Sequence, residues 1–270
     1  MTRRDLSPDY ENAAHIPDGA SYPARWKAKA AAFRENAPGR VVTGVEYGPG
    51  HRQRVDLFYP ESAPRGLAVI VHGGYWMKFG PSDWSHLARG AVEAGWLAVV
   101  PGYTLAPNAR IRDIGREIGQ CLDALAGHAP GPIRLAGHSA GGQIVARLAC
   151  EGAPVSRPTA ERIERVIAIS GLADLRPLIR TGMVHTLELD EAEAMAESPA
   201  FLTPLPHVDT VAWVGAQERP EFVRQNLLLA TAWRPFARSV VHVEDAGRHH
   251  FDVVEGLEDA ATALGRAFLD

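Results

Sequence analysis

A serine framed by two glycines is the first feature of this chain that could do chemistry. The sequence GHSAG at 137–141 places Ser139 between an apolar, strand-like run and the helical pattern QIVARLAC. On a sharp strand-to-helix turn the serine backbone is strained, and glycines two residues before and after it avoid clashes with neighbouring backbone. The turn raises the hydroxyl above the sheet and directs the helix N-terminus at developing negative charge. The pattern predicts Ser139 as a nucleophile for acyl transfer; the alternative is a serine that only caps the helix.

Consecutive glycines in HGGYW, at 72–76, suggest where that negative charge would be stabilised. Acyl transfer passes through a tetrahedral intermediate, whose oxyanion needs backbone N–H donors directed at it. Glycines let the backbone approach a substrate without side-chain obstruction. We therefore predict an oxyanion hole formed by the N–H groups of Gly73, Gly74 and Ala140. The alternative is a tight glycine turn without chemistry, and His72 is expected to hold this loop by a hydrogen bond.

The two aromatic residues that end this motif, Tyr75 and Trp76, have two interpretations. They could be packed against the body of the protein. They could instead bind substrate by lining an acyl or leaving-group pocket, because such pockets are lined mainly by apolar and aromatic side chains. The sequence favours neither interpretation.

A serine hydroxyl needs a neighbouring base to accept its proton, and a histidine is the expected base. Hydrolases with this type of serine turn supply the triad in the chain order serine, acid, histidine. The segment EDAGRHHFD, after the last apolar run, contains His249 and His250. Either could serve. Phe251 would anchor the loop, which favours His250 as the base with His249 outside.

These residues must be positioned by a sheet, and the chain alternates short apolar runs with helical segments. The apolar runs are 67–72, 96–101, 133–137, 165–170, 211–215 and 239–243, and the helical segments are 83–95, 110–127, 141–151, 190–197, 220–232 and 255–269. Buried parallel strands are apolar throughout because helices cover both faces. The alternation predicts a single-domain, doubly wound α/β fold with a mostly parallel sheet, in which functional residues follow the carboxyl ends of strands.

The first part of the chain has a different pattern. Trp26, Ala30 and Phe33 recur at helical spacing, so we predict a helix at 23–36. Two antiparallel edge strands follow at 41–48 and 54–60. We therefore divide the chain into a leader with its helix, residues 1–40, and an α/β domain, residues 41–270, as one structural unit.

Composition excludes several classes of partner. Hydrophobic residues make up 46% and charged residues 22%, the formal net charge is −4 and the pI is about 6.3. Nothing in this charge favours nucleic acid, and no apolar run reaches the length of a membrane span. The first residues lack the apolar core of a signal peptide, and Cys121 and Cys150 lie in helix-like apolar patterns typical of buried thiols. We expect a cytoplasmic protein that acts on a small molecule; a homodimer is compatible with the sequence.

Taken in order, HGGYW, GHSAGGQ and HHFD resemble the kynurenine formamidase (arylformamidase) branch of the α/β-hydrolase fold, which is related to the hormone-sensitive-lipase-like esterases. PGYTLAP at 101–107 is similar to a Y-x-L-A-P stretch of the wider group, and 9–26, 170–178 and 198–204 are similar to corresponding segments of the branch. The resemblance implies hydrolysis of an N-formyl arylamine, such as N-formylkynurenine, or of small carboxylic esters, without a metal or cofactor.

The acid of the triad is expected after the apolar run 211–215. The branch has a loop resembling D-S-P-E-F there, whereas this chain reads ERPEF, so Glu218 matches the triad acid with one additional methylene. Glu221 lies where the next helix begins, and the helix dipole is a sufficient reason for a carboxylate there. Asp174, in the loop SGLAD after the preceding strand, is a rival acid whose alternative role is helix capping. Glu218 follows the strand after which the triad acid is expected, whereas Asp174 follows the strand before it, so the order of the strands favours Glu218 over Asp174.

Other functions stay open at this point. A general short-chain carboxylesterase would use the same residues, and a catalytically silent relative could only bind a ligand. The connecting segment from Gly171 to Thr210 contains one charged helix. It is too short for a large lid domain, so we expect a small substrate. The N-terminal helix could cover part of the pocket or simply pack against the sheet.

Overall fold

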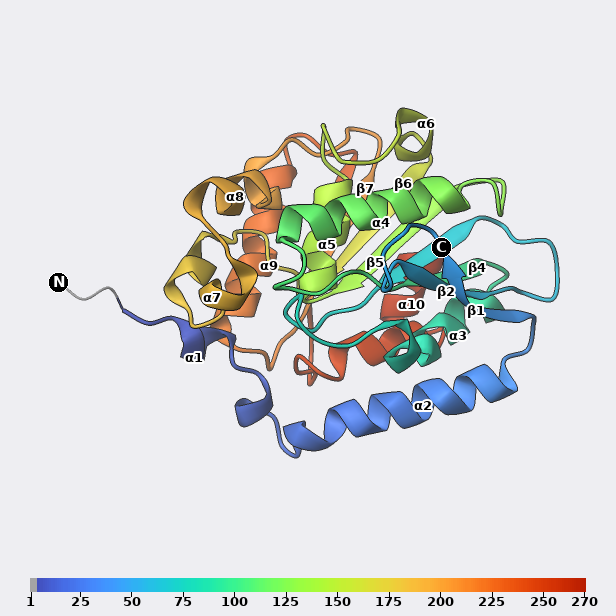
Figure 1. The fold of residues 1–270 in the computed structure, drawn as a ribbon, viewed down its shortest axis with the longest axis horizontal. Coiled ribbons are helices and arrows are strands. Elements are labelled where there is room, and N and C mark those ends of the chain that lie inside the picture. The colour runs from blue at the N-terminus through green and yellow to red at the C-terminus, as the bar shows by residue number, and fades with distance from the viewer. Residues whose placement is uncertain (1–3) are drawn as a thin grey trace.

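An eight-stranded sheet forms the centre of the computed structural model, which describes residues 4–270 (Figure 1). The strands are β1 Val41–Glu46, β2 Arg54–Phe58, β3 Leu67–Val71, β4 Leu97–Pro101, β5 Ile133–His138, β6 Ile163–Ile169, β7 Asp209–Gly215 and β8 Ser239–Asp245. Their order in the sheet is β1-β2-β4-β3-β5-β6-β7-β8. β3 to β8 are parallel to one another, and β1 and β2 form an antiparallel edge beside β4. The predicted fold is confirmed, and each strand lies within two residues of its expected bounds.

Helices cover both faces of this sheet. They are α1 Ser7–Tyr10, α2 Tyr22–Asn36, α3 Arg89–Glu93, α4 Ile111–Leu125, α5 Ala140–Leu148, α6 Arg157–Ala160, α7 Val184–Leu187, α8 Glu191–Ala196, α9 Pro220–Trp233 and α10 Ala263–Leu269. Figure 1 shows α4, α5 and α9 on one side of the sheet and α2, α3 and α10 on the other.

Alternation along the strands explains why the core has two parts. Successive strand residues point to opposite faces. In β3, Leu67 and Val69 therefore belong to the cluster beneath α4 and α5, whereas Ala68 and Ile70 belong to the cluster beneath α2 and α10. Because both faces are covered, every residue of β3 is buried. This is the reason that the strand is apolar throughout.

Several helical segments differ from the sequence prediction. The segment expected at 83–95 consists of two 3₁₀ helices, Pro81–Asp83 and Ser85–Ala88, followed by the short α3. The helix expected at 255–269 is divided into a 3₁₀ helix, Val253–Glu258, and α10. Thr262 accounts for this division, because its hydroxyl accepts a hydrogen bond from the Gly265 N–H at 2.8 Å and caps a new helix.

The connection between β6 and β7 also contains more than the one helix expected. It contains the 3₁₀ helices Arg176–Arg180 and Pro199–Phe201 as well as α7 and α8. Both 3₁₀ helices have a proline at their start, where the N–H that proline lacks would have no partner within the helix.

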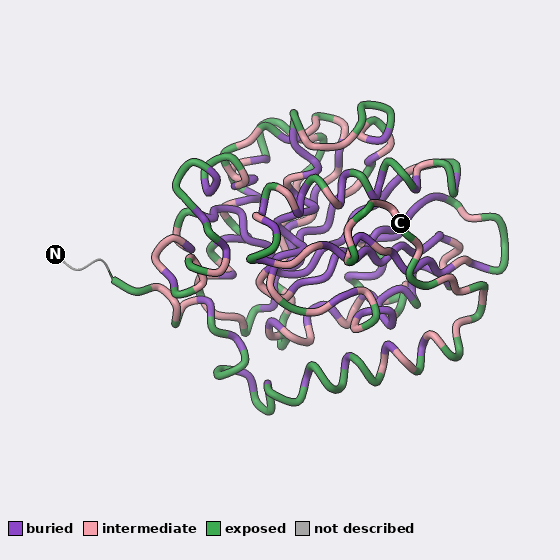
Figure 2. The backbone as a smooth tube through the Cα atoms, in the orientation of Figure 1, coloured by how far each residue is buried: buried purple, intermediate pink, exposed green. Residues whose placement is uncertain are grey.

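The described part of the leader, residues 4–40, packs against the body of the protein. Two 3₁₀ helices, Ala13–His15 and Gly19–Ser21, connect α1 to α2. α2 buries Tyr22, Trp26, Ala30 and Phe33. The three aromatic residues among them belong to the same hydrophobic cluster as strand residues of the sheet, and Figure 2 shows buried stretches alternating with exposed ones along α2. Within residues 4–270, no helix combines the length and hydropathy needed to cross a membrane.

Candidate active site

Ser139 lies on a strained turn between β5 and α5. Its φ and ψ are 56° and −114°, a conformation that is costly for a residue with a Cβ. The Ser139 N–H donates to Ile169 O of the next strand at 2.8 Å, which holds the turn in place. A Cβ at Gly137 would lie 2.1 Å from Gly141 O, and a Cβ at Gly141 would lie 2.1 Å from Val71 O. Only glycine fits at these two positions, as the motif predicts.

The loop after β3 lies beside this serine. A Cβ at Gly73 would lie 2.8 Å from His138 O and 3.1 Å from the Ser139 Cβ. Gly74 has a φ of 112°, and its carbonyl accepts hydrogen bonds from the N–H groups of the residues three and four positions later. Within residues 4–270, the N–H groups of Gly73 and Gly74 have no hydrogen-bond acceptor. They are therefore free to bind an oxyanion. Ala140, the first residue of α5, likewise has an N–H without an intrahelical partner.

His72 holds this loop, as expected from the sequence. Burial lowers its pKa to about 4, so the imidazole is neutral near neutral pH. Its Nδ1 then donates to Gly73 O at 2.7 Å. Tyr103 stacks on the His72 ring with 4.4 Å between ring centroids and donates from its hydroxyl to His72 O at 3.1 Å. The hydrogen bond and the stacking contact together hold the ring in place.

His250 and Glu218 form a buried pair. Nδ1 of His250 lies 2.5 Å from Oε2 of Glu218, and the Glu218 side chain is 0% exposed. The other carboxylate oxygen, Oε1, accepts from the Gly215 N–H at 2.8 Å and from the Ser170 hydroxyl. Both oxygens are thus engaged, and the longer glutamate arm reaches the histidine from a turn directly after β7. Ser170 and Gly215 were not found from the sequence; their only signal is a position at the carboxyl end of neighbouring strands.

Two further contacts fix the histidine loop. Nε2 of His138 contacts His250 O at 2.8 Å, and the two rings lie 4.7 Å apart. Burial, together with the proximity of His250, lowers the pKa of His138 well below its ordinary value, so His138 is neutral and donates this bond. Phe222, in the first turn of α9, packs on the His250 ring at 4.3 Å. Among the contacts of residues 4–270, Nε2 of His250 has no protein partner, and His250 lines the same cavity as Ser139.

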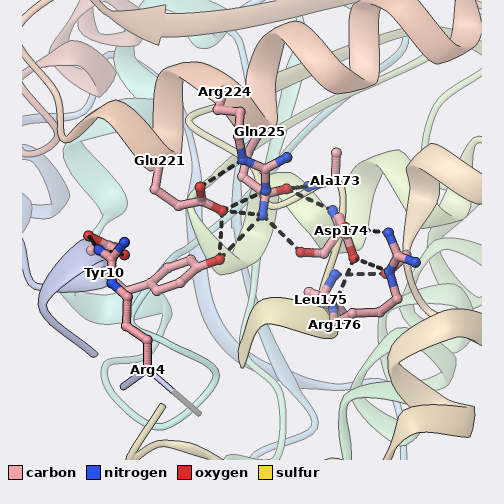
Figure 3. Close-up of polar contacts among 11 residues, drawn as sticks. Arg4, Tyr10, Ala173, Asp174, Leu175, Arg176, Glu221, Arg224 and Gln225 are labelled. Carbon is pink, nitrogen blue, oxygen red and sulfur yellow. Dashed lines mark hydrogen bonds and ion pairs between the residues drawn. The ribbon is translucent and has the colours of Figure 1, made fainter. Parts of the chain in front are cut away.

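The rival acids are held by other partners. Asp174 accepts hydrogen bonds from the Arg176 N–H and from both ends of its guanidinium, at 2.9–3.0 Å (Figure 3). Glu221 lies in the first turn of α9, as expected, and accepts two bonds from Arg224. It also accepts a bond from the Tyr10 hydroxyl at 2.8 Å, which ties the leader to α9. Among the contacts of residues 4–270, Glu218 is the carboxylate paired with His250.

His249 points toward the leader instead of the serine. Its Nε2 lies 3.1 Å from the Tyr22 hydroxyl, and its Nδ1 accepts from the backbone N–H groups of Phe251 and Asp252. Because both ring nitrogens are engaged in holding loops, the geometry favours His250 over His249 as the base.

A cavity of about 150 Å³ lies at this point and is lined by both Ser139 and His250. Its walls include four aromatic side chains, those of Trp26, Phe79, Trp84 and Phe251. Trp26 comes from α2, so the N-terminal helix does cover the cavity. Sequence reasoning did not identify Phe79, Trp84 or Phe251 as lining residues, because aromatic residues in irregular segments have no periodicity that reveals where they point.

The structure separates Tyr75 from Trp76. Tyr75 lines the cavity, and its hydroxyl donates to Tyr10 O at 3.0 Å. Trp76 is only 1% exposed, belongs to the core cluster and donates from Nε1 to Gln143 Oε1 at 3.2 Å. Of the two interpretations that the sequence leaves open, packing applies to Trp76, and its assignment beside Tyr75 as a substrate-binding residue is corrected because its ring is buried in the core.

Comparisons with known proteins agree with this fold. The family model for the α/β hydrolase fold matches residues 68–245. Kynurenine formamidase of Salmo salar is 26% identical over 85% of this chain and 81% of its own length, and that of Drosophila melanogaster is 26% identical over 80% and 77%. A crystal structure described as a candidate thioesterase from Silicibacter sp. TM1040 is 42% identical, with a TM-score of 0.94 over 98% of this chain and 99% of that one. Esterase B of Lactobacillus rhamnosis shares the fold at 18% identity, with a TM-score of 0.64 over 92% and 90%. The chain belongs to the α/β-hydrolase fold family.

Proposed function

We propose that this protein is a serine hydrolase that cleaves a small amide or ester, with an N-formyl arylamine such as N-formylkynurenine as its substrate. The observation that carries the proposal is the buried contact of 2.5 Å between His250 and Glu218, beside a cavity that Ser139 also lines. A histidine oriented by a carboxylate and facing a strained serine is the arrangement that nucleophilic acyl transfer requires.

Each residue has a role in the proposed reaction. His250 accepts the proton of Ser139 as the Ser139 Oγ attacks the formyl or acyl carbonyl carbon. The oxyanion is stabilised by the N–H groups of Gly73, Gly74 and Ala140, and Glu218 stabilises the imidazolium. His250 then protonates the leaving amine or alcohol. Water, activated by the same histidine, hydrolyses the acyl-enzyme and regenerates the serine.

The dimensions of the cavity support a small substrate. A cavity of about 150 Å³ with apolar walls is the size that holds a single benzene-sized ring. The aromatic walls suit an arylamine. The curated relatives named kynurenine formamidase align over most of the chain, which supports a formyl amide.

Replacement of Ser139 tests the proposal. Ser139→Ala is expected to lower kcat for N-formylkynurenine by at least about a thousandfold, because no other group can form the acyl-enzyme. Ser62→Ala, at an exposed loop serine, is the matched control and should retain wild-type kcat. A fluorophosphonate probe should label wild type at Ser139 and leave Ser139→Ala unlabelled. Wild-type turnover by Ser139→Ala would refute the mechanism, and absence of labelling in wild type would favour a catalytically silent binding protein.

A second candidate is hydrolysis of a thioester or a short-chain carboxylic ester. It is favoured by the 42% identical structure that is described as a candidate thioesterase. The same triad and oxyanion donors would serve, so only the leaving group differs. Comparing kcat/KM for N-formylkynurenine, p-nitrophenyl acetate and an acetyl thioester distinguishes the candidates. A higher kcat/KM for either ester than for the formamide would overturn the formamidase assignment and leave the serine mechanism intact.

A further inference from the structure

A second cavity adjoins the catalytic one and has no role in the mechanism above. It measures about 370 Å³, and the two cavities share Tyr75 and Lys78 as lining residues. The catalytic cavity holds about one aromatic ring, so the rest of any larger substrate must extend beyond it. Because the two cavities share these lining residues, the second cavity can receive that part.

The shared wall is held in a fixed position. The Tyr75 hydroxyl donates to Tyr10 O at 3.0 Å and accepts from Asn12 Nδ2 at 3.3 Å. Burial above all, with a smaller contribution from the charge of Glu11, raises the pKa of Tyr75. The phenol is therefore neutral and adds no charge to either cavity.

The lining of the second cavity carries one cation and one anion. Lys78 and Glu11 are its charged residues, and the remainder is largely apolar, with Met77 and Met183 among it. Within residues 4–270, neither Lys78 nor Glu11 has an oppositely charged side chain within 4.0 Å. The two charges are thus available to a ligand. A ligand that carries only one charge would leave either Lys78 or Glu11 without a partner.

We propose that the second cavity is the subsite for an α-amino acid group of the substrate, with Lys78 binding the carboxylate and Glu11 binding the ammonium. The methionines contact the aliphatic carbons between this group and the aromatic ring. For its connection to catalysis the subsite rests on the function proposed above, since the ring and the scissile bond would occupy the catalytic cavity.

Three matched ligands test the two charges separately. Binding of kynurenine, of kynuramine, which lacks the carboxylate, and of the desamino analogue, which lacks the ammonium, is measured by calorimetry on Ser139→Ala protein. We expect kynurenine to bind about fivefold more tightly than either analogue, the upper range for one exposed ion pair. Lys78→Met should remove only the preference for kynurenine over kynuramine. Glu11→Gln should remove only the preference for kynurenine over the desamino analogue. Lys27→Met, which removes an exposed lysine of α2 that lines neither cavity, should change no ratio.

Filling the cavity gives an independent test. A Cβ at Gly182 would meet only the Ser7 Oγ, at 3.8 Å, so a side chain can enter the cavity there without distorting the backbone. Gly182→Leu should weaken kynurenine binding and leave turnover of p-nitrophenyl acetate unchanged, whereas Gly182→Ala should change neither.

The outcomes separate the subsite from the function. Equal binding ratios in Lys78→Met and Lys27→Met, or no preference of the starting protein for kynurenine, would overturn the subsite. If the ratios behave as expected but wild type does not hydrolyse N-formylkynurenine, the subsite stands and the formamidase assignment falls.

Discussion

The structure makes a sharp prediction about Glu218→Gln. Oε1 of Glu218 accepts from the Gly215 N–H at 2.8 Å, and Oε2 contacts His250 Nδ1 at 2.5 Å. In glutamine one oxygen becomes an NH₂ group. Because the Gly215 N–H can only donate, the amide oxygen must face it, and the NH₂ group must face His250. Nδ1 then has to accept, which leaves the proton of the neutral ring on Nε2, where it blocks acceptance of the Ser139 proton.

The magnitude follows from this wrong tautomer. Amide replacement of the acid in a serine–histidine–acid triad costs about 10⁴ in kcat, or about 5.5 kcal/mol of transition-state stabilisation. Glu218→Asp keeps the charge but withdraws the carboxylate by about 1.5 Å, so the contact with His250 lengthens beyond hydrogen-bond range. We expect its loss in kcat to be intermediate, about a hundredfold.

Initial rates with saturating p-nitrophenyl acetate measure both variants, and circular dichroism verifies that each is folded. Asp174→Asn is the matched control, because Asp174 is paired with Arg176 and should retain kcat within about threefold. If Asp174→Asn loses as much activity as Glu218→Gln, or if Glu218→Gln keeps a tenth of wild-type kcat, then the assignment of Glu218 is wrong.

Three further predictions concern packing and pH. Gly141→Ala should lower the free energy of unfolding by about 3 kcal/mol or more, because the added Cβ would lie 2.1 Å from Val71 O. Gly115→Ala has open space around the added Cβ and should raise the free energy of unfolding by about 0.5–1 kcal/mol, since alanine favours the helix α4. Urea unfolding measures both variants. Burial lowers the pKa of His86 to about 3, so folding keeps this ring neutral and stability is lost as pH falls from the unfolded value of about 6.5 toward 3. His86→Phe should flatten the stability curve in that window by about 1.4 kcal/mol per pH unit, and an unchanged slope in urea unfolding at pH 7, 6 and 5 would contradict this. Trp26→Ala should cost about 3–5 kcal/mol and raise KM, since it removes a wall of the catalytic cavity; an unchanged KM would show that α2 does not contact substrate.

Local patterns predicted the strands well because a buried parallel strand requires an apolar residue at every position. The same reasoning predicted the turn at Ser139, since Gly137 and Gly141 have no room for a Cβ. Local patterns failed at 253–258, where apolar spacing looks helical but a capping threonine starts a separate helix. They could not separate Tyr75 from Trp76, because a motif does not show on which side of a loop a ring packs.

By itself, the sequence determined the α/β architecture, the strand segments along the chain and the positions of the candidate nucleophile and oxyanion glycines. These features depend on spacings of a few residues along the chain. Only the tertiary structure decided which carboxylate meets His250, which histidine faces the cavity and that the leader supplies a wall. Glu218, Glu221 and Asp174 are chemically alike, and the differences between them arise from partners contributed by other loops and helices. Contacts such as that between Tyr10 and Glu221 join residues 211 positions apart, a separation that no local pattern encodes.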